Sequence, residues 1–434
     1  MHRSLIGPLG ALTLAAALVS CARAPGPLAA RAAAGDLAAL AASYRLERRA
    51  VIKVDHPAFL DLHGEAGGEP TLMVSSFGVF GGDAVRAFRG LGGLLAGRGL
   101  TPQLVTDKVV WPNEVKPVPS SVMPGGYLVA GGFLVPGKTG ALTIVSPGGA
   151  TRALTATGPV TERKPGFFYH RAMWRDMDGD GRLDVLTARA KKPIMGPTVG
   201  ELVWLSEPRG RAGLWQEHVI AQGPDVHFRL ADLDGDGVEE VLASEFFAKR
   251  FSVHWREGSA WRSRVVDNQC GAAFDLEVAD LNGDGVRDVV LTNHEGNAKA
   301  GAFAYEIPRD WKNTLWKRHT LTQGIKTTNP GMNQASPGAP VVLPGAGPNG
   351  KALILLAGDG SQHVHLLVPT SAERTDWGHT RLDLVDLDST VGQLAVADLD
   401  GDRAPEVFVP AYDKHQIHVF TLRGPAAGRA KRTR

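Results

Sequence analysis

Runs of alternating apolar and polar residues recur along the chain, and four pairs of them flank a nearly identical acidic loop. In one pair, Phe228 and Leu230 alternate with polar residues before the loop, and Val241-Leu242 follows it at once. A period of two on both sides of a short polar segment is typical of two β-strands joined by a loop. The chain is therefore predicted to consist of repeated strand–loop–strand units.

The four acidic loops occupy residues 176–184, 232–240, 280–288 and 398–406. Each has oxygen-bearing side chains at positions 1, 3, 5 and 9, glycine at position 4 and usually glycine at position 6. A hard cation such as calcium prefers about six to eight oxygen ligands, and a tight loop can turn its odd positions inward, with a backbone carbonyl added by position 7. We therefore predict up to four calcium ions, with these ligands: Asp176, Asp178, Asp180, Arg182, Asp184, Asp232, Asp234, Asp236, Val238, Glu240, Asp280, Asn282, Asp284, Val286, Asp288, Asp398, Asp400, Asp402, Ala404 and Glu406.

The loops are similar to EF-hand loops over their first six positions but differ beyond them. An EF-hand needs a bidentate Glu at about position 12 and flanking helices, whereas here the last acidic residue is at position 9 and strands follow. In the last loop Arg403 replaces the glycine at position 6 and Pro405 precedes Glu406. This loop is expected to be the weakest of the four sites.

Degenerate copies of the loop begin near residues 61, 118 and 343, so the chain contains seven units of roughly fifty to sixty residues. His63 occupies a ligand position in the first copy and makes metal doubtful there, and the other two copies keep no carboxylates. A Trp-containing strand also recurs before the next loop, at Trp215, Trp261, Trp316 and more loosely Trp377. Units of this length suit a propeller with four strands per blade.

Both ends of the chain are predicted to share one blade. After Asp398 there is room for only three more strands, ending near residue 422, and residues 44–54 resemble the Trp-containing fourth strand. Closure of the ring by an N-terminal strand would remove open sheet edges. The prediction is an all-β, seven-bladed β-propeller over residues 44–423, with acidic calcium-binding hairpin loops.

The stretches Val278-Ala-Asp-Leu-Asn-Gly-Asp-Gly285 and Leu230-Ala-Asp-Leu-Asp-Gly-Asp-Gly237 resemble the FG-GAP/VCBS repeat family. That family includes the calcium-loop propeller of integrin α-subunits and many exported bacterial proteins. Clean units cover most of residues 165–295 and 385–422, and degenerate units cover most of the rest. The resemblance implies a propeller that binds calcium. It does not specify a function, because such propellers serve as adhesins, glycan-binding proteins and, less often, enzyme scaffolds.

The N-terminal residues 1–24 are interpreted as an export signal, with Arg3 before an apolar segment. Leu18-Val19-Ser20-Cys21 resembles a bacterial lipobox, which would make Cys21 the lipidation site; the alternative is ordinary cleavage after Ala24. Cys270 would then be the only cysteine, so calcium rather than a disulfide would brace the fold. Residues 25–43 read as a flexible tether and 424–434 as a basic disordered tail. The expected location is the outer membrane or cell surface, or the medium.

The net charge gives little information about partners. The formal net charge is +2, which gives no reason to expect nucleic acid, and any membrane contact would come through the lipid anchor.

If each acidic loop joins the first two strands of a blade, the opposite mouth of the axial channel gathers residues from the starts of the first strands and the ends of the second strands. The predicted axial ring is His170, Arg171, His227, Arg229, Glu245, Asp275, Glu277, His294 and Gln393. Its polar groups suggest a ligand site, although internal salt bridges at a solvated channel mouth would explain them too.

Three functions are compatible with this pattern. The first, which the absence of any nucleophile motif favours, is a monomeric cell-surface binding module for polysaccharide or protein, with Phe246-Phe247 and Trp311 as exposed stacking platforms. The second is a carbohydrate-active enzyme of lyase or dehydratase type. In it His170, His227 and His294 would bind a transition metal or act as acid and base, and Arg171 and Arg229 would hold a uronate. The third is a structural or assembly lipoprotein.

Overall fold

The computed structural model describes residues 39–64, 68–134, 138–156, 166–193, 196–208, 213–328 and 335–425. The predicted export signal at residues 1–24, with Cys21, lies outside the described residues. So do most of the predicted tether at 25–43 and most of the predicted tail at 424–434. The packed chain is already established at Ala41, which is buried in the core between the last two blades.

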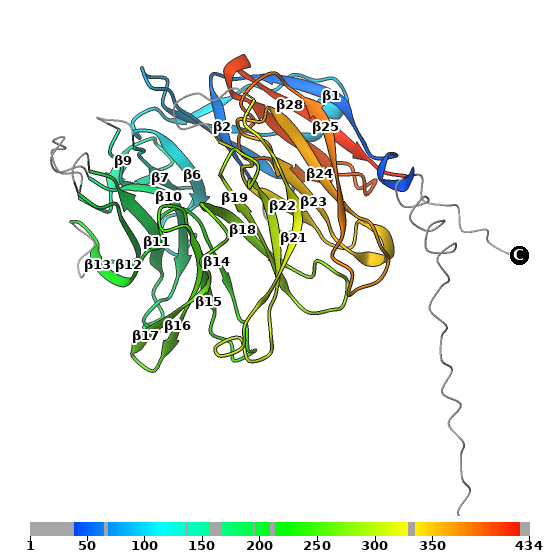
Figure 1. The fold of residues 1–434 in the computed structure, drawn as a ribbon. Helices are drawn as coiled ribbons and strands as arrows, with labels where there is room; N and C mark the ends of the chain where they lie inside the picture. The colour runs from blue at the N-terminus through cyan, green and yellow to red at the C-terminus, as the bar shows by residue number, and fades with distance from the viewer. Residues whose placement is uncertain are drawn as a thin grey trace, which may run out of the picture.

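The described chain forms seven antiparallel four-stranded sheets arranged as the blades of a ring, which confirms the predicted seven-bladed propeller (Figure 1). Blade 1 comprises β2 (Pro57–His63), β3 (Thr71–Ser76), β4 (Ala84–Phe88) and β5 (Gln103–Thr106). Blade 2 comprises β6 (Pro112–Pro117), β7 (Tyr127–Gly131), β8 (Leu142–Val145) and β9 (Thr151–Ala153). Blade 3 comprises β10 (Phe168–Arg175), β11 (Asp184–Lys191), β12 (Val199–Ser206) and β13 (Gln216–Gln222).

The remaining blades repeat this order. Blade 4 comprises β14 (Phe228–Ala231), β15 (Glu240–Glu245), β16 (Arg250–Glu257) and β17 (Ala260–Asp267). Blade 5 comprises β18 (Ala273–Ala279), β19 (Asp288–Asn293), β20 (Gly301–Glu306) and β21 (Lys317–Gln323). Blade 6 comprises β22 (Pro340–Leu343), β23 (Leu353–Ala357), β24 (His363–Pro369) and β25 (His379–Asp386). Blade 7 comprises β26 (Ala395–Ala397), β27 (Glu406–Ala411), β28 (Gln416–Arg423) and β1 (Arg45–Lys53).

The blade made from both chain ends closes the ring. β1 pairs antiparallel with β28 along its length, from Arg45 opposite Arg423 to Lys53 opposite Gln416. In Figure 1 the blue N-terminal strand lies beside the red C-terminal strand. Closure by the N-terminal strand is therefore confirmed. The C-terminal part of the chain supplies three strands of blade 7, and β1 supplies the fourth, outer strand.

Burial follows the position of each strand in its blade. The second strands lie between two others and between neighbouring blades, and all residues of β15, β19 and β27 are buried. The cores lie between blades: Leu72 and Phe88 of blade 1 share a cluster with Phe408 of blade 7. Each such side chain contributes about 1.5–3 kcal/mol of hydrophobic stabilisation. The blade-to-blade contacts therefore hold the ring together.

The recurring Trp residues belong to this packing. Trp215, Trp316 and Trp377 lie just before outer strands and are buried, and Trp261 lies in β17. Helical structure is minor in the described ranges: residues 39–41, α2 (Gly92–Leu95) and the 3-10 turns η1 (Pro348–Gly350) and η2 (Tyr412–Lys414). Across the described ranges, the helices are all too short or too polar to cross a membrane.

One of the degenerate loops is not where the sequence predicted it. Asp61 lies inside β2 rather than at the start of a loop, and its carboxylate accepts a hydrogen bond from Lys116 at 3.1 Å. His63 contacts the Val115 carbonyl at 2.7 Å. Asp61 and His63 alternate along β2 with the same spacing as the ligands of an acidic loop, and the loop was therefore predicted to begin too early. The loops near residues 118 and 343 do connect the first two strands of blades 2 and 6.

Candidate functional site

Two opposite faces of the ring carry the candidate chemistry. The four acidic loops connect the first and second strands of blades 3, 4, 5 and 7, so they lie on one face, called here the acidic face. The starts of the first strands and the ends of the second strands lie on the other face. This second face carries a chain of aromatic rings, described below, and is called the aromatic face.

Three of the acidic loops bring three carboxylates together. Positions 1, 3 and 9 form groups whose ligand oxygens lie within 4.8 Å of one another: Asp176, Asp178 and Asp184; Asp232, Asp234 and Glu240; Asp398, Asp400 and Glu406. Such groups could hold a metal ion. The position-5 residues Asp180, Asp236 and Asp402 are not in these groups. Each instead accepts a hydrogen bond from the position-7 backbone N–H, donated by Arg182, Val238 and Ala404 at 2.7–2.8 Å.

A common set of hydrogen bonds fixes these loops. In the loop of blade 4, Asp232 accepts hydrogen bonds from Gly235 and Gly237, and Glu240 accepts one from Leu233 at 2.8 Å. The other three loops repeat the same contacts. Glycine is favoured at both turns, because the backbone there has φ of +79° and +86°. The sequence spacing thus encodes a preformed acidic turn.

The position-9 carboxyl groups are buried under the loops. Burial, followed by the neighbouring loop carboxylates, raises the pKa of Asp184 to about 6 and the pKa values of Glu240 and Asp288 to about 7. Burial also raises the pKa of Glu406. A nearby cation would favour the ionised form of these groups. The loops therefore concentrate negative charge that a bound cation would neutralise.

The loop of blade 5 differs from the others. Asn282 replaces the position-3 carboxylate and donates a hydrogen bond to Asp284 at 3.0 Å, while Asp280 and Asp288 keep their places. The Asp284 carboxylate also accepts a hydrogen bond from the Val286 backbone N–H. This loop has no group of three close acidic ligands, whereas the last loop, with Arg403, has one. Of the four loops, the loop of blade 5 is therefore the poorest in close acidic ligands, whereas the sequence had pointed to the last loop as the weakest site.

The first strands of blades 1 to 5 line the axis with ion pairs. Arg171 contacts Glu114 at 2.9 Å and Asp275 at 3.1 Å, and Arg229 bridges Asp275 and Glu277. Asp275 and Arg171 are almost fully buried. Burial alone would lower the pKa of Arg229, but Asp275 and Glu277 raise it above its ordinary value. The structure thus brings these predicted residues together, as a mutually paired network.

The other predicted ring residues are placed differently. His227 and His294 contact backbone carbonyls of Phe274 and Pro337, and Gln393 donates to the carbonyl of Leu60. Glu245 makes its contacts inside blade 4, with Arg250 and Ser252 across the β15–β16 hairpin. Its position at the end of β15 turns it towards its strand partner, so its assignment to the axial ring is corrected. In the described ranges, His170, His227 and His294 do not form a close metal-ligand group.

A continuous series of ring contacts crosses the aromatic face. Phe77 stacks on Trp111 with centroids 4.4 Å apart, and Trp111 stacks on Phe133 at 5.1 Å. The series extends through blades 7, 1, 2, 3, 4 and 5, with successive centroids 4.4–6.2 Å apart: Tyr412, Phe77, Trp111, Phe133, His170, His227, Phe274, His294 and Phe246. Phe59 and Phe168 flank His170. We call this set the aromatic chain.

Buried polar atoms without partners lie next to this chain. They are the Ser76 hydroxyl, the Asn113 side-chain oxygen and His170 Nδ1. Ser75 and Tyr169 accompany them: the Ser75 hydroxyl donates to the Asn113 carbonyl, and the Asn113 amide donates to the Tyr169 carbonyl, both at 2.7 Å. Burial, and then His227, lowers the pKa of His170 to about 3, so its ring is neutral. Unpaired buried polar atoms are uncommon and point to unseen water or ligand.

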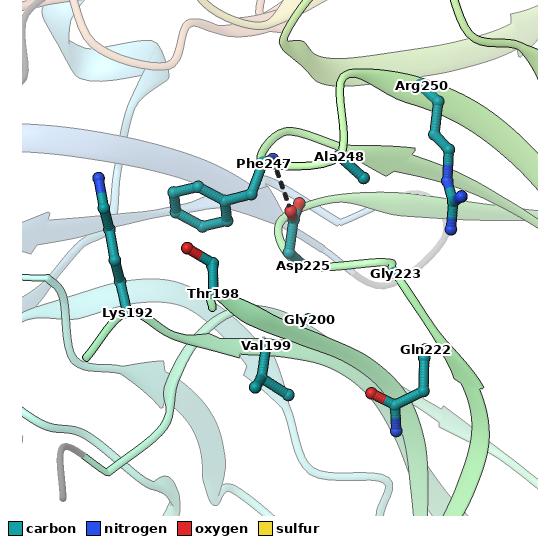
Figure 2. Close-up of a pocket in the computed structure, with 10 residues that line it drawn as sticks. All are labelled: Lys192, Thr198, Val199, Gly200, Gln222, Gly223, Asp225, Phe247, Ala248 and Arg250. Carbon is teal, nitrogen blue, oxygen red and sulfur yellow. Dashed lines mark hydrogen bonds between the residues drawn. The ribbon is translucent and has the colours of Figure 1, made fainter. Parts of the chain in front are cut away.

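A pocket of about 520 Å³ opens between blades 3 and 4 on the same face. Figure 2 shows Lys192 and Arg250 at opposite ends, with the Phe247 ring between Lys192 and Asp225. Both Asp225 oxygens accept backbone hydrogen bonds, from Phe246 and Phe247 at 2.8 Å. The pocket therefore has an aromatic wall, but its carboxylate is already engaged and Arg250 is paired with Glu245.

Some aromatic and histidine side chains outside the aromatic chain are buried or already paired. Trp311 is only 1% exposed and packs edge-on against Trp255, so its expected role as a stacking platform is wrong. The half-buried Phe246 and Phe247 do lie at the aromatic face. His365 in β24 contacts Asp383 at 2.6 Å and Ser361 at 2.9 Å, so its ring nitrogens are paired within blade 6.

The sequence reading missed most of the aromatic chain. Phe59, Phe77, Trp111 and Phe133 lie in blades 1 and 2, where the acidic loops are degenerate. The available signal was their position: each lies near the start of a first strand or the end of a second strand. In blade 1 that position could not be assigned once Asp61 had been taken as a loop residue. In blade 2 the loop near residue 118 was placed correctly, and Trp111 and Phe133 were overlooked.

Comparison with models of known protein families found no match to the chain, and comparison with curated proteins found none. The candidate chemistry therefore rests on the acidic loops, the axial ion pairs and the aromatic chain themselves.

Proposed function

We propose that this protein is an exported, calcium-binding propeller of the FG-GAP/VCBS type, which binds polysaccharide on its aromatic face. The observation that carries the proposal is the aromatic chain, with Phe77, Trp111 and Phe133 at its centre. Trp111 is buried between Phe77 and Phe133, so the half-buried outer rings, rather than Trp111, offer the apolar surface against which the apolar face of a sugar ring can pack. A few convergent polar groups then fix the orientation of the ligand.

The polar groups required for such a site are available beside the aromatic chain. Ser76, Asn113 and His170 keep hydrogen-bonding capacity that the described part of the chain does not use. These atoms are shielded from solvent, so a sugar hydroxyl would reach the Asn113 oxygen, the neutral His170 ring or the Ser76 hydroxyl only after overlying side chains move. Phe59, Phe77 and Phe133 are only half-buried. Their partial exposure supports contact with a ligand from outside.

Calcium is proposed for the acidic face rather than for the binding face. The ligands are oxygens only, which suits a hard cation, and the loops are preformed turns. Cys270, the cysteine within the described ranges, is free and buried, so no disulfide braces the ring there. The export part of the proposal is supported by the sequence of residues 1–24, with its basic start and apolar segment.

The enzymatic alternative receives less support from the axial residues. A uronate would need a free guanidinium, but Arg171 and Arg229 are both engaged by Asp275. His170 has a pKa of about 3 because of burial, so it is a weak base near neutral pH. We therefore propose binding rather than turnover.

The test is to incubate the purified protein with immobilised neutral and acidic polysaccharides in calcium, and to record retention and released products together. Phe133→Ala is expected to weaken retention by about tenfold, equivalent to roughly 1.4 kcal/mol. Trp261→Ala is the matched control, because Trp261 is also a half-buried aromatic residue but lies on the outer strand β17. Its retention should equal that of the unaltered protein.

Three outcomes would contradict the proposal. Shortened or unsaturated products would indicate an enzyme, and absence of retention on every polysaccharide would favour a protein ligand or a structural role. Equal loss in Phe133→Ala and Trp261→Ala would mean that the aromatic face has no specific part in retention. The folded state of each variant should be checked by its thermal midpoint in calcium.

A further inference from the structure

A second pocket lies where the ring closes. It has a volume of about 460 Å³ and is formed by the end of β1 with its connection to β2, by β4, and by the turn between β27 and β28. Blade 7 and blade 1 thus supply opposite walls. We call it the seam pocket.

The seam pocket is strongly basic. Its lining includes Lys53, Arg86, Lys414 and His415, against a single acidic residue, Asp55. Asp55 is 72% exposed at its side chain and lies 3.7 Å from His415, and Lys414 pairs with Asp388, which is 85% exposed. Such exposed pairs interact only weakly, and the basic residues still outnumber the acidic ones. The pocket therefore keeps an excess of positive charge, unlike the pocket of blades 3 and 4, where Glu245 engages Arg250.

Arg86 contributes the guanidinium of the seam pocket. Its Nη1 is shielded from solvent and has no hydrogen-bond partner in the described structure. A guanidinium always carries charge and has no neutral form to adopt near neutral pH. Leaving such a donor buried without an acceptor costs free energy, so native structures normally supply one. The protein supplies none here, and because Arg86 also lines the pocket, an anion bound there would lie beside the charge of this guanidinium.

We propose that the seam pocket binds an oxyanion, with Arg86 as its main ligand and Lys53 and Lys414 as supporting charges. The matching chemistry is a sulfate, phosphate or carboxylate group, because planar guanidinium nitrogens pair well with such oxygens. The group could belong to a free ion or to an acidic polysaccharide. The pocket is separate from the aromatic chain, so this proposal does not depend on polysaccharide binding there.

The ring closure explains why an anion site would form at this place. β1 brings Lys53 to the seam only when it has paired with β28, and Lys53 lies opposite Gln416 in that pairing. The same turn carries Lys414 and His415, and His415 adopts a left-handed backbone with φ of +55°. A bound anion would therefore contact both ends of the folded chain and stabilise the closed ring.

The test is calorimetric titration of the full chain with sodium sulfate and sodium phosphate, against sodium chloride at matched ionic strength. The unaltered protein should bind sulfate or phosphate saturably, and Arg86→Gln should weaken that binding by about tenfold or more. Without added anion, Arg86→Gln should melt no lower than the unaltered protein, because it removes a buried donor that has no acceptor. Lys317→Gln, an exposed position in blade 5, is the matched control and should bind normally.

Sulfate also stabilises proteins by exclusion from their surfaces, so a rise in the thermal midpoint alone does not demonstrate binding. The evidence for a specific site is the difference in binding between the unaltered protein and the variants. If Arg86→Gln fails to fold, the exposed Lys53→Gln and Lys414→Gln substitutions take its place, each with an expected severalfold loss. Absence of saturable binding, or equal binding by all variants, would overturn the proposal. Competition by sulfated but not desulfated polysaccharide would assign the anion to a glycan, whereas binding of the inorganic ion alone would assign a free anion.

Discussion

At the residue scale, one backbone position separates the four acidic loops. Position 6 has positive φ in all of them, with glycine at Gly181, Gly237 and Gly285 but Arg403 in the last loop, at φ of +68°. A side chain in the left-handed region costs roughly 1–2 kcal/mol, whereas glycine enters it freely. The Arg403 side chain is exposed, while its backbone N–H donates to Asp398 at 3.0 Å. The strain is therefore local to the turn.

Arg403→Gly is expected to raise the free energy of unfolding by about 0.5–1 kcal/mol, because relief of strain exceeds the added entropy of the unfolded chain. Gly401→Ala, two residues earlier at φ of +75°, should lower it by a similar amount. Chemical denaturation in excess calcium measures both. Equal midpoints for the two variants would show that the turn stores no strain.

Other residues show where sequence reasoning stops. The acidic loop residues were identifiable because four copies fix their spacing, and turn geometry follows from glycine positions. The exposure of Trp311 was not identifiable, since it depends on Trp255 of the preceding blade. The pairing of Arg171 with Asp275 joins residues that are far apart in sequence. Contacts between blades carry no local pattern, so they require the folded ring.

At the element scale, the N-terminal strand β1 closes the ring by pairing with β28. β1 presents neighbouring residues to the core between blades 7 and 1 and to solvent: Ile52 is 5% exposed and shares a core cluster with Ile417 and Phe408, whereas Val51 is 40% exposed. The strand was predictable from its similarity to the Trp-containing strands. The inner strand β2 was only partly predictable, because its alternating polar residues contact Lys116 and Val115 rather than a metal.

Ile52→Ala is expected to lower the free energy of unfolding by about 2–4 kcal/mol, since it opens a cavity in the core that joins both chain ends. Val51→Ala, its neighbour on the opposite side of β1, should change stability by less than about 0.5 kcal/mol. Urea denaturation of the two variants provides the comparison. If both variants lose the same small amount, β1 adds an edge strand without closing the core.

At the scale of the whole molecule, the two faces have separate tasks in our interpretation. The acidic face holds preformed turns at the ends of first strands, and those turns also contact neighbouring blades. Arg256 of blade 4 donates to the Met177 carbonyl in the loop of blade 3, and Lys312 of blade 5 lies 3.5 Å from Asp234 of blade 4. A cation in one loop would therefore stabilise its blade and the contact with the next. The aromatic face stays available for a ligand.

Removal of calcium is the corresponding prediction. If three loops bind calcium at about one hundred times their dissociation constants, each adds about 2.7 kcal/mol, and a chelator should lower the thermal midpoint by roughly 10 °C. Asp178→Ala should remove about a third of that response, because Asp178 belongs to the three-carboxylate group of blade 3. Glu239→Ala is the matched control: Glu239 lies at position 8 of the loop of blade 4, outside the carboxylate group of that loop, and pairs with Arg175.

Magnesium should substitute poorly for calcium, since it requires a smaller octahedral site than these loops provide for calcium. An unchanged midpoint after chelation would mean that the acidic turns fold without a cation, held by their glycine conformations and backbone hydrogen bonds alone.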